Sequence, residues 1–176
     1  MKNVIPAGVG IDPIDGGITA ADGFRAAGVA CGIKKTGALD LALIVADGLA
    51  TAAGVFTTNK AQAAPVLVSR DHLTASAGRA AAIIVNSGCA NACTGPEGLA
   101  VTRSSADFVA SMLGCRPEHV LVASTGVIGV QLDLDKVRKG AGAYPDSTNI
   151  RPICHRNGSC SRRSTDSQPS TRVGVL

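Results

Sequence analysis

The stretch AAAIIVNSGCANACTG, residues 80–95, carries the strongest fold signal in the chain. Its first six residues form a continuous apolar run, which is typical of a strand buried on both faces. A polar loop follows, and Thr94 with Glu97 makes the pattern of a capping box at a helix start. Apolar residues then recur at helical spacing as far as Gly114, a natural helix end. The stretch predicts a strand, a tight loop and a helix in succession.

Other apolar runs extend this pattern on both sides. Residues 41–46 and 119–123 predict two more buried strands. Shorter elements are expected at residues 53–57 and 65–68 (strands), 70–77 (a short helix) and 133–139 (a helix with acidic residues first). The mixture indicates an α/β fold in which mixed sheets are layered with helices. Strands that are apolar on both faces need cover on both sides of the sheet.

Composition and charge exclude several classes of function. Apolar residues make up 45% of the chain and aromatic residues only 2%. A platform that stacks nucleic-acid bases needs exposed aromatic rings, so no nucleic-acid partner is expected. The net charge of +4 lies mostly in the tail, because residues 1–140 hold twelve basic and eleven acidic residues. No apolar run approaches the ~20 residues of a membrane span, so no membrane partner is expected.

The six cysteines indicate reduced thiols rather than a disulfide framework. Lys2 is followed by a mild stretch that Asp12 and Asp15 interrupt, which does not resemble a secretory signal. A cytoplasmic location is therefore expected. A zinc site could be drawn from five residues, but their spacing is poor and no metal is expected; they are Cys89, Cys93, Cys154, His155 and Cys160.

Two loops are candidates for chemistry. In ASTGVIG, residues 123–129, a strand ends on Gly126, where glycine permits a sharp turn. With the Thr125 hydroxyl beside it, this turn could bind the oxyanion of an acyl-transfer reaction, or it could be an ordinary strand end. The loop at residues 86–95 could hold a thiol nucleophile, Cys89 or Cys93, but neither has a histidine nearby in sequence. A tight, self-hydrogen-bonded connection is the alternative.

Glycine and lysine patterns elsewhere carry less information. Residues 8–10 form a fragment of a dinucleotide-binding motif with no strand before it and no helix after it, so no nucleotide cofactor is expected. Lys34, Lys35 and Lys60 are predicted to be solvated side chains.

Several strings together resemble the ornithine acetyltransferase family of arginine biosynthesis. They occur in the family's order and spacing and cover about residues 4–140: GFRAAGVACGIK (23–34), DLALI (40–44), AGVFTTN (53–59), APV (64–66), NSGCANACTG (86–95) and ASTGVIG (123–129). The last two strings are the most distinctive. Residues 1–140 are therefore identified as the N-terminal, alpha-chain part of such an enzyme.

The resemblance implies an activity and a set of partners. The family moves an acetyl group from N-acetylornithine to glutamate through an acetyl-threonine, and some members also use acetyl-CoA, with no resident cofactor. The threonine becomes the first residue of a second, beta chain when the precursor cleaves itself, and an alpha2beta2 assembly is expected. Thr125 and Gly126 match the family's oxyanion-hole pair.

The sequence departs from the family after residue 140. The Lys-Gly-x-Gly-Met stretch and the Ala-Thr-Met cleavage site are absent, and residues 141–176 are rich in Ser and Arg without periodicity. We interpret them as a tail outside the family pattern, disordered or frameshifted; in that case another reading frame beyond codon 140 encodes the missing strings. The chain is then expected to be inactive alone. The alternatives are a non-catalytic binding or regulatory fragment and a different transferase or hydrolase that uses Cys89 or Cys93.

Overall fold

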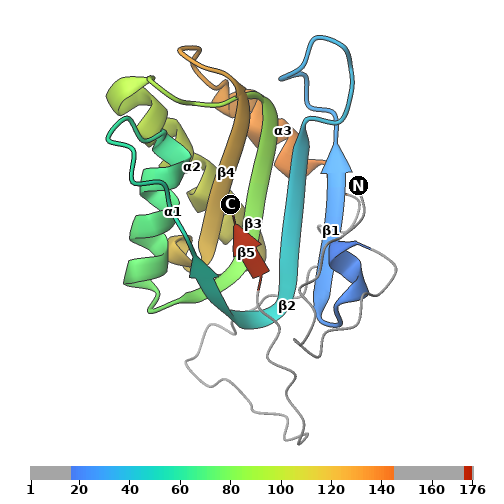
Figure 1. Cartoon of the computed structure of the whole chain (residues 1–176). Coiled ribbons are helices and arrows are strands. Elements are labelled where there is room, and N and C mark those ends of the chain that lie inside the picture. Colours follow the sequence, from blue (N-terminus) through green and yellow to red (C-terminus); the bar gives the residue numbers. More distant parts are fainter. Residues whose placement is uncertain (1–16, 145–172, 176) are drawn as a thin grey trace, which may run out of the picture.

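A mixed β-sheet with helices on one face and along one edge forms the centre of the fold (Figure 1). The computed structural model describes residues 17–144 and 173–175. The strands are β1 (Phe24–Val29), β2 (Leu41–Gly54), β3 (Arg79–Cys89), β4 (Val120–Val127) and β5 (Val173–Val175). The helices are η1 (Ile18–Ala20), α1 (Ala64–Ala75), α2 (Gly95–Leu113), η2 (Pro117–His119) and α3 (Leu134–Gly142).

The sheet has the strand order β1-β2-β3-β4, and β5 pairs with the end of β2. β1 and β2 are antiparallel, as are β2 and β3, whereas β3 and β4 are parallel. A parallel pair needs a crossover connection, and α2 supplies it between β3 and β4. This topology confirms the predicted α/β class with a mixed sheet.

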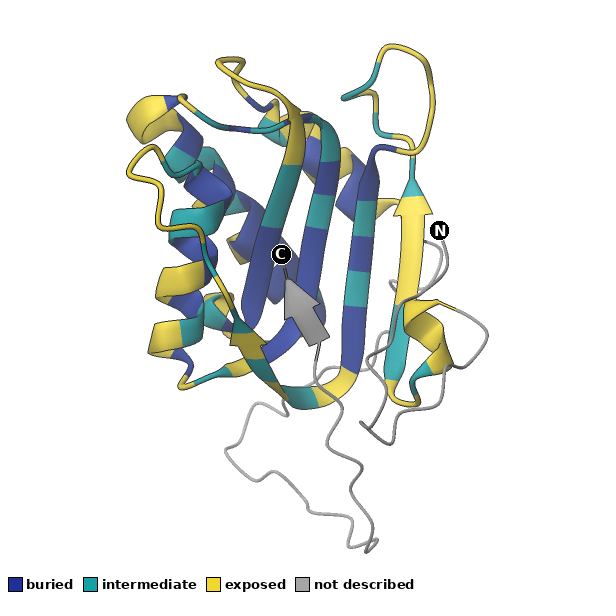
Figure 2. Cartoon of the chain, in the orientation of Figure 1, coloured by how far each residue is buried: buried dark blue, intermediate teal, exposed yellow. Residues whose placement is uncertain are grey.

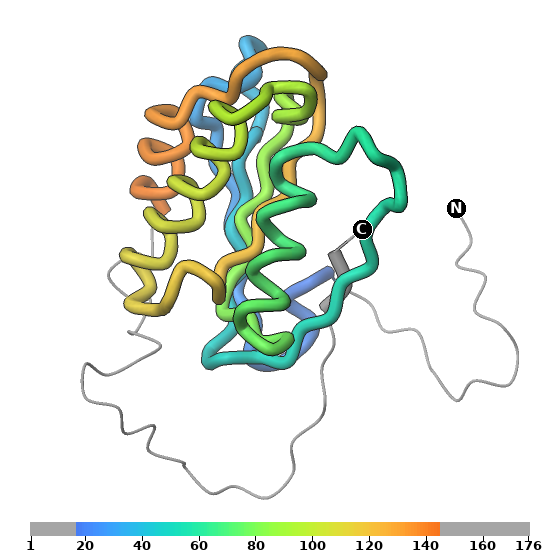
Figure 3. The backbone as a smooth tube through the Cα atoms, turned by 90° about the vertical axis from the view of Figure 1, so that its left-hand side faces the viewer, coloured from blue at the N-terminus to red at the C-terminus, as the bar shows by residue number. Residues whose placement is uncertain are grey.

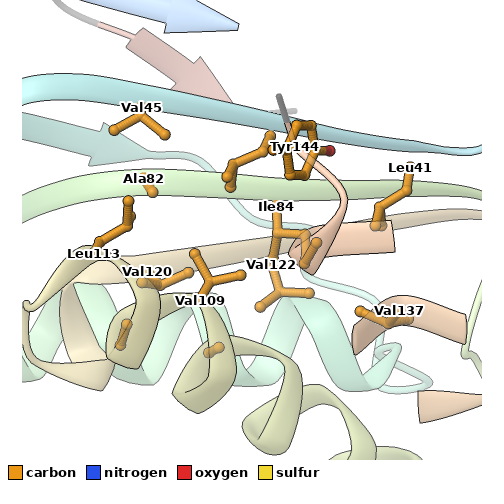
Figure 4. Close-up of a cluster of buried hydrophobic side chains, with 14 of the residues drawn as sticks. Leu41, Val45, Ala82, Ile84, Val109, Leu113, Val120, Val122, Val137 and Tyr144 are labelled. Carbon is orange, nitrogen blue, oxygen red and sulfur yellow. The ribbon is translucent and has the colours of Figure 1, made fainter. Parts of the chain in front are cut away.

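The main hydrophobic core lies between one face of the sheet and the helices α2 and α3 (Figure 3). Figure 4 shows how the side chains interdigitate, with Val109 and Leu113 of α2 facing Val120 of β4, and Val137 coming from α3. Val109, Leu113 and Val120 are completely buried. Burying side chains of this size stabilises a fold by about 1.5–3 kcal/mol each before entropy is counted.

The opposite face of the sheet is also apolar. In Figure 2 the viewer looks at this face, and none of the described helices lies over it. A small cluster of Ala80, Ile83 and Leu121 is buried there, while Ile44 and Val85 remain half-buried around it. The prediction that the central strands are apolar on both faces is confirmed.

Helix α1 lies along the outer edge of β4, and its Leu73 also packs against the small cluster on the second face. The Ser69 hydroxyl donates to the Val122 carbonyl (2.7 Å) and accepts from the Val122 amide (2.9 Å). His72 Nδ1 lies 2.8 Å from the Val120 carbonyl and therefore carries the proton. Both side chains are buried. The edge strand thus pairs with helix side chains where a further strand would otherwise bind.

The sequence-based boundaries were wrong around α1. Residues 65–68 are the first turn of this helix and not a strand, because Pro65 occupies an early helical position where its missing N–H costs nothing. The helix predicted at 70–77 therefore begins six residues earlier, at Ala64. The strand predicted at 53–57 ends at Gly54, where it is the tail of the long β2. β2 passes its expected end at residue 46 through a register shift between Val45 and Ala50.

The start of α2 is also different from the prediction. Thr94 is its N-cap residue, but no side chain caps the helix, so the capping box with Glu97 does not form. The Thr94 hydroxyl donates instead to Oδ1 of Asn91 (2.7 Å). The predicted end is confirmed: Gly114 adopts the left-handed conformation, with φ +65°.

Helix α3 confirms the helix predicted at 133–139 and continues beyond residue 140. Asp133 caps it by accepting from the amides of Asp135 and Lys136. The helix ends at Gly142, and Ala141 and Tyr144 are buried in the main core. Most of the tail lies outside the described residues, so the domain boundary at residue 140 stays a prediction.

Gly140 of α3 packs tightly against Cys31 and Leu41, which allows a test of this packing. A Cβ at this position would lie 2.7 Å from Cβ of Cys31 and 2.7 Å from Cδ2 of Leu41. We expect Gly140→Ala to lower the free energy of unfolding by about 2 kcal/mol through overpacking. Gly142→Ala is the matched control, because nothing lies within 4 Å of its Cβ position. Urea unfolding followed by circular dichroism measures both; equal stability of the two variants would contradict the packing described.

Candidate functional site

The two residues predicted to bind an oxyanion lie at the end of β4, beside the end of β3. Parallel pairing puts Thr125 opposite Ser87 and Gly126 opposite Gly88. The carboxyl ends of both strands therefore meet at one edge of the sheet, where open α/β sheets commonly bind ligands. Thr125 and Gly126 are both exposed. The Thr125 hydroxyl has no hydrogen bond to the described part of the chain and is free to donate to a bound group.

Gly126 can occupy this position only because it lacks a side chain. Its φ is +135°, and a Cβ would lie 2.5 Å from the Cys89 amide nitrogen and overlap the Gly88 carbonyl carbon. Gly88 also has a positive φ, +103°. The two glycine backbones thus pack directly against each other and fix the path of the chain directly after Thr125.

The loop between β3 and α2 is held by its own hydrogen bonds. Asn91 is completely buried, and its amide group donates to the Gly98 carbonyl (3.0 Å) and to the Thr102 hydroxyl (2.8 Å). Its Oδ1 accepts from Thr94. Asn91 has φ +47°, a left-handed conformation that asparagine tolerates. The interpretation of this loop as a tight, self-hydrogen-bonded connection is confirmed.

The same loop is tied to the segment that follows the candidate pair. The Ala90 amide donates to the Val127 carbonyl (2.9 Å), and the Gly129 amide donates to the Ala92 carbonyl (2.9 Å). The Ser124 hydroxyl donates to Oδ1 of Asn86 on the neighbouring strand (2.5 Å). These contacts hold Thr125 between two anchored segments, and such preorganisation is what a site that stabilises charge requires.

The cysteines of the loop have no catalytic partner in the described structure. Cys89 is buried, and its thiol donates to the Val130 carbonyl (3.2 Å). His72 is hydrogen-bonded to β4. His119 lies beside Arg116, and burial, together with this neighbouring positive charge, lowers the pKa of His119. A metal-binding group of three or more ligands is absent from the described residues, and Cys154, His155 and Cys160 lie outside them.

Asp40 is a structural centre that the sequence analysis missed. It is buried, and its carboxylate accepts from the amides of Cys31 (2.7 Å) and Lys34 (2.8 Å). Burial alone would raise the pKa of Asp40, but these hydrogen bonds hold it below its usual value. Burial and the adjacent carboxylate raise the pKa of Cys31 to about 11, so its thiol stays protonated. An acidic residue directly before an apolar strand was the available signal.

The fold and the site together define a mixed α/β protein with an exposed Thr-Gly pair where two parallel strands end. None of its described helices could cross a membrane. A comparison with protein families matches residues 25–169 to the ArgJ family, and the chain belongs to that family. The match includes residues beyond 140. Membership in the ornithine acetyltransferase family, inferred above from six strings of residues, is confirmed.

Two bacterial proteins are similar to this chain over most of its length. The arginine biosynthesis bifunctional protein ArgJ of Gloeobacter violaceus is 53% identical over 134 residues, which are 76% of this chain and 33% of that protein. The protein of the same name from Thermosynechococcus vestitus is 56% identical over 126 residues, 72% of this chain and 30% of that protein. The chain thus spans about a third of the length of these relatives.

Two crystal structures share the fold. The ornithine acetyltransferase of Mycobacterium tuberculosis, solved in complex with ornithine, is 52% identical with a TM-score of 0.68, covering 71% of this chain and 67% of that one. The arginine biosynthesis bifunctional protein ArgJ of Bacillus halodurans is 39% identical with a TM-score of 0.70, covering 78% and 71%. The similarity therefore extends to the arrangement of the sheet and its helices.

Proposed function

We propose that this chain supplies the oxyanion-binding part of a glutamate N-acetyltransferase that takes its acetyl group from N-acetylornithine, with acetyl-CoA as a second donor. The observation that carries the proposal is the exposed Thr125-Gly126 pair, held between anchored segments in a member of the ArgJ family. Its location in the cytoplasm and the absence of a resident cofactor are parts of the same proposal.

The chemistry divides between this chain and a nucleophile outside it. A threonine hydroxyl attacks the acetyl carbonyl of N-acetylornithine, and the carbonyl oxygen becomes an oxyanion. Collapse of the intermediate breaks the C–N bond and releases ornithine, whose amine takes up the proton. The amine of glutamate then attacks the acetyl-threonine, the C–O bond of the ester breaks, and the proton lost by the amine returns to the threonine oxygen. The Thr125 hydroxyl and the backbone at Gly126 stabilise the negative charge in both steps, which is commonly the largest contribution in acyl transfer.

The nucleophilic threonine belongs to a beta chain in this proposal. Resemblance to the family supports a precursor that cleaves itself before that threonine, followed by an alpha2beta2 assembly. The described residues of this chain place Thr125 at an exposed edge, where a second chain can reach it. A non-catalytic binding or regulatory fragment remains the alternative function.

The 176-residue chain should therefore not transfer acetyl groups by itself. Without a nucleophile, oxyanion stabilisation leaves only a small residual rate. The assay incubates the purified chain with labelled N-acetylornithine and glutamate and measures labelled N-acetylglutamate. The full-length Gloeobacter violaceus relative is the positive control. Turnover by the isolated chain within about tenfold of that control would refute the division of labour proposed here.

A further inference from the structure

A cavity of about 160 Å³ lies between the start of α1, the loop that precedes this helix and the end of β4, and we call it the α1 pocket. A water molecule occupies ~30 Å³ in the liquid, so the pocket is several times larger than one water or one methyl group. Its wall is formed by Val55, Phe56, Thr57, Ala63, Pro65, Val66, Ser69, Val122, Ala123 and Ser124.

The wall of the α1 pocket carries no charge, because none of its residues is acidic or basic. Two of its hydroxyl groups are already engaged: Ser69 donates to the Val122 carbonyl, and Ser124 donates to Oδ1 of Asn86. A charged group placed there would lose its hydration without gaining a partner of opposite charge, which is costly. The pocket therefore suits the apolar end of a small molecule.

The α1 pocket lies on the same face of the sheet as the Thr125 hydroxyl. Side chains alternate along β4: Val120 and Val122 belong to the main core, whereas Leu121 belongs to the small cluster on the second face. Ala123 and Thr125 follow Leu121 at even spacing and share that second face. Ala123 lines the pocket, and two residues of a strand span about 6.6 Å. The pocket thus begins a few carbon–carbon bonds from Thr125.

The acyl group is the only part of either substrate in the proposed function that ends without a charge. The remainder of N-acetylornithine, and all ends of glutamate, carry ammonium or carboxylate groups. With the acyl oxygen roughly 3 Å from the Thr125 hydroxyl, as an oxyanion donor requires, the acyl chain can extend along β4 toward Ala123.

We propose that the α1 pocket binds the acyl chain of the donor and sets the longest acyl group that is transferred, an inference that rests on the proposed function. The acetyl methyl occupies only the entrance of the pocket, whereas a butyryl chain reaches Phe56 and Val66 in its wall. Transfer of a longer acyl group forms and breaks the same bonds as transfer of acetyl, so only the contacts of the chain differ.

Transfer from N-acetylornithine and from N-butyrylornithine to glutamate, by the enzyme completed with the downstream part of the sequence, tests the proposal. The measured quantity is the butyryl-to-acetyl ratio of kcat/KM, which is independent of the fraction of active protein. Val66→Phe fills the pocket and should lower this ratio about 16-fold, because each of the two extra methylenes loses a gain of about fourfold from burial. Leu67→Phe is the matched control, since Leu67 is half-buried on the same helix and does not line the pocket.

An enlarged pocket should change the preference in the opposite direction. Phe56→Ala removes the largest side chain of the wall and should raise the hexanoyl-to-acetyl ratio of kcat/KM by a similar factor. Circular dichroism shows whether each variant keeps the fold. Val66→Leu, a smaller change, should lower the butyryl-to-acetyl ratio in the same direction if Val66→Phe does not fold.

The outcomes separate this proposal from the proposed function. The acyl assignment is overturned if the completed wild-type enzyme transfers acetyl but not butyryl, or if Val66→Phe and Leu67→Phe change the ratio equally. Acetyl transfer itself is then still intact. A completed wild-type enzyme that transfers no acetyl from N-acetylornithine contradicts the proposed function, and the acyl assignment fails with it.

Discussion

Replacing Thr125 by alanine should lower kcat about 10²–10³-fold in an enzyme completed with the downstream part of the sequence. The exposed hydroxyl at the end of β4 is the donor that the variant removes, and losing one oxyanion donor typically costs about 2.7–4 kcal/mol of transition-state stabilisation. Substrate affinity should change little, because the bond is made mainly in the transition state. Steady-state kinetics with N-acetylornithine and glutamate measure both quantities.

Two further variants make this experiment specific. Thr125→Ser keeps a hydroxyl at the same position and should retain most of the activity. Thr51→Ala removes an exposed threonine from the far end of β2 and should have no effect on kcat. A Thr125→Ala enzyme within twofold of the wild-type kcat would remove this residue from the mechanism.

Asn91→Ala should lower the free energy of unfolding by roughly 3 kcal/mol. The variant deletes a buried amide that makes hydrogen bonds to Gly98, Thr102 and Thr94, and each buried polar group left unsatisfied costs about 1–3 kcal/mol. Alanine is also less tolerant than asparagine of the left-handed backbone, where φ is +47°. A loss of this size should lower Tm by roughly 10 °C in a domain of this length.

The control for this variant is Asn59→Ala. Asn59 is exposed, and its side chain accepts only from the Ala61 amide in the same loop (2.9 Å). Its replacement should lower Tm by no more than about 2 °C. Thermal unfolding followed by circular dichroism compares the two. If both variants melt alike, the buried network does not hold the β3–α2 loop in place.

The sequence predicted helices and strands most accurately where the local pattern and the tertiary contacts favour the same element. The apolar runs of β2, β3 and β4 are strands, and the periodic positions of α2 face the core as far as Gly114. The error at 65–68 arose because Val66 and Val68 favour strands locally. Tertiary contacts decide otherwise: Val68 is completely buried, and the next residue, Ser69, bonds to β4.

The candidate site was likewise predictable only where a local sequence pattern was sufficient. Thr125 and Gly126 could be singled out because their string, ASTGVIG, resembles that of a known family, whereas the residue types alone also fit an ordinary strand end. That Gly126 packs on Gly88 could not be predicted, since the parallel register of β3 and β4 brings together residues 38 positions apart. The role of Asp40 depends on a loop that folds back on itself, because its carboxylate accepts from amides nine and six residues earlier in the chain.

The protected edge of β4 determines how copies of this chain can associate. Ser69 and His72 occupy the backbone groups at which a foreign strand would bind, so strand addition is closed on that side. β1 lies at the opposite edge and has no partner on its outer side within the described residues. Copies of this chain therefore cannot extend the sheet past β4, and growth into a continuous fibre through that edge is blocked.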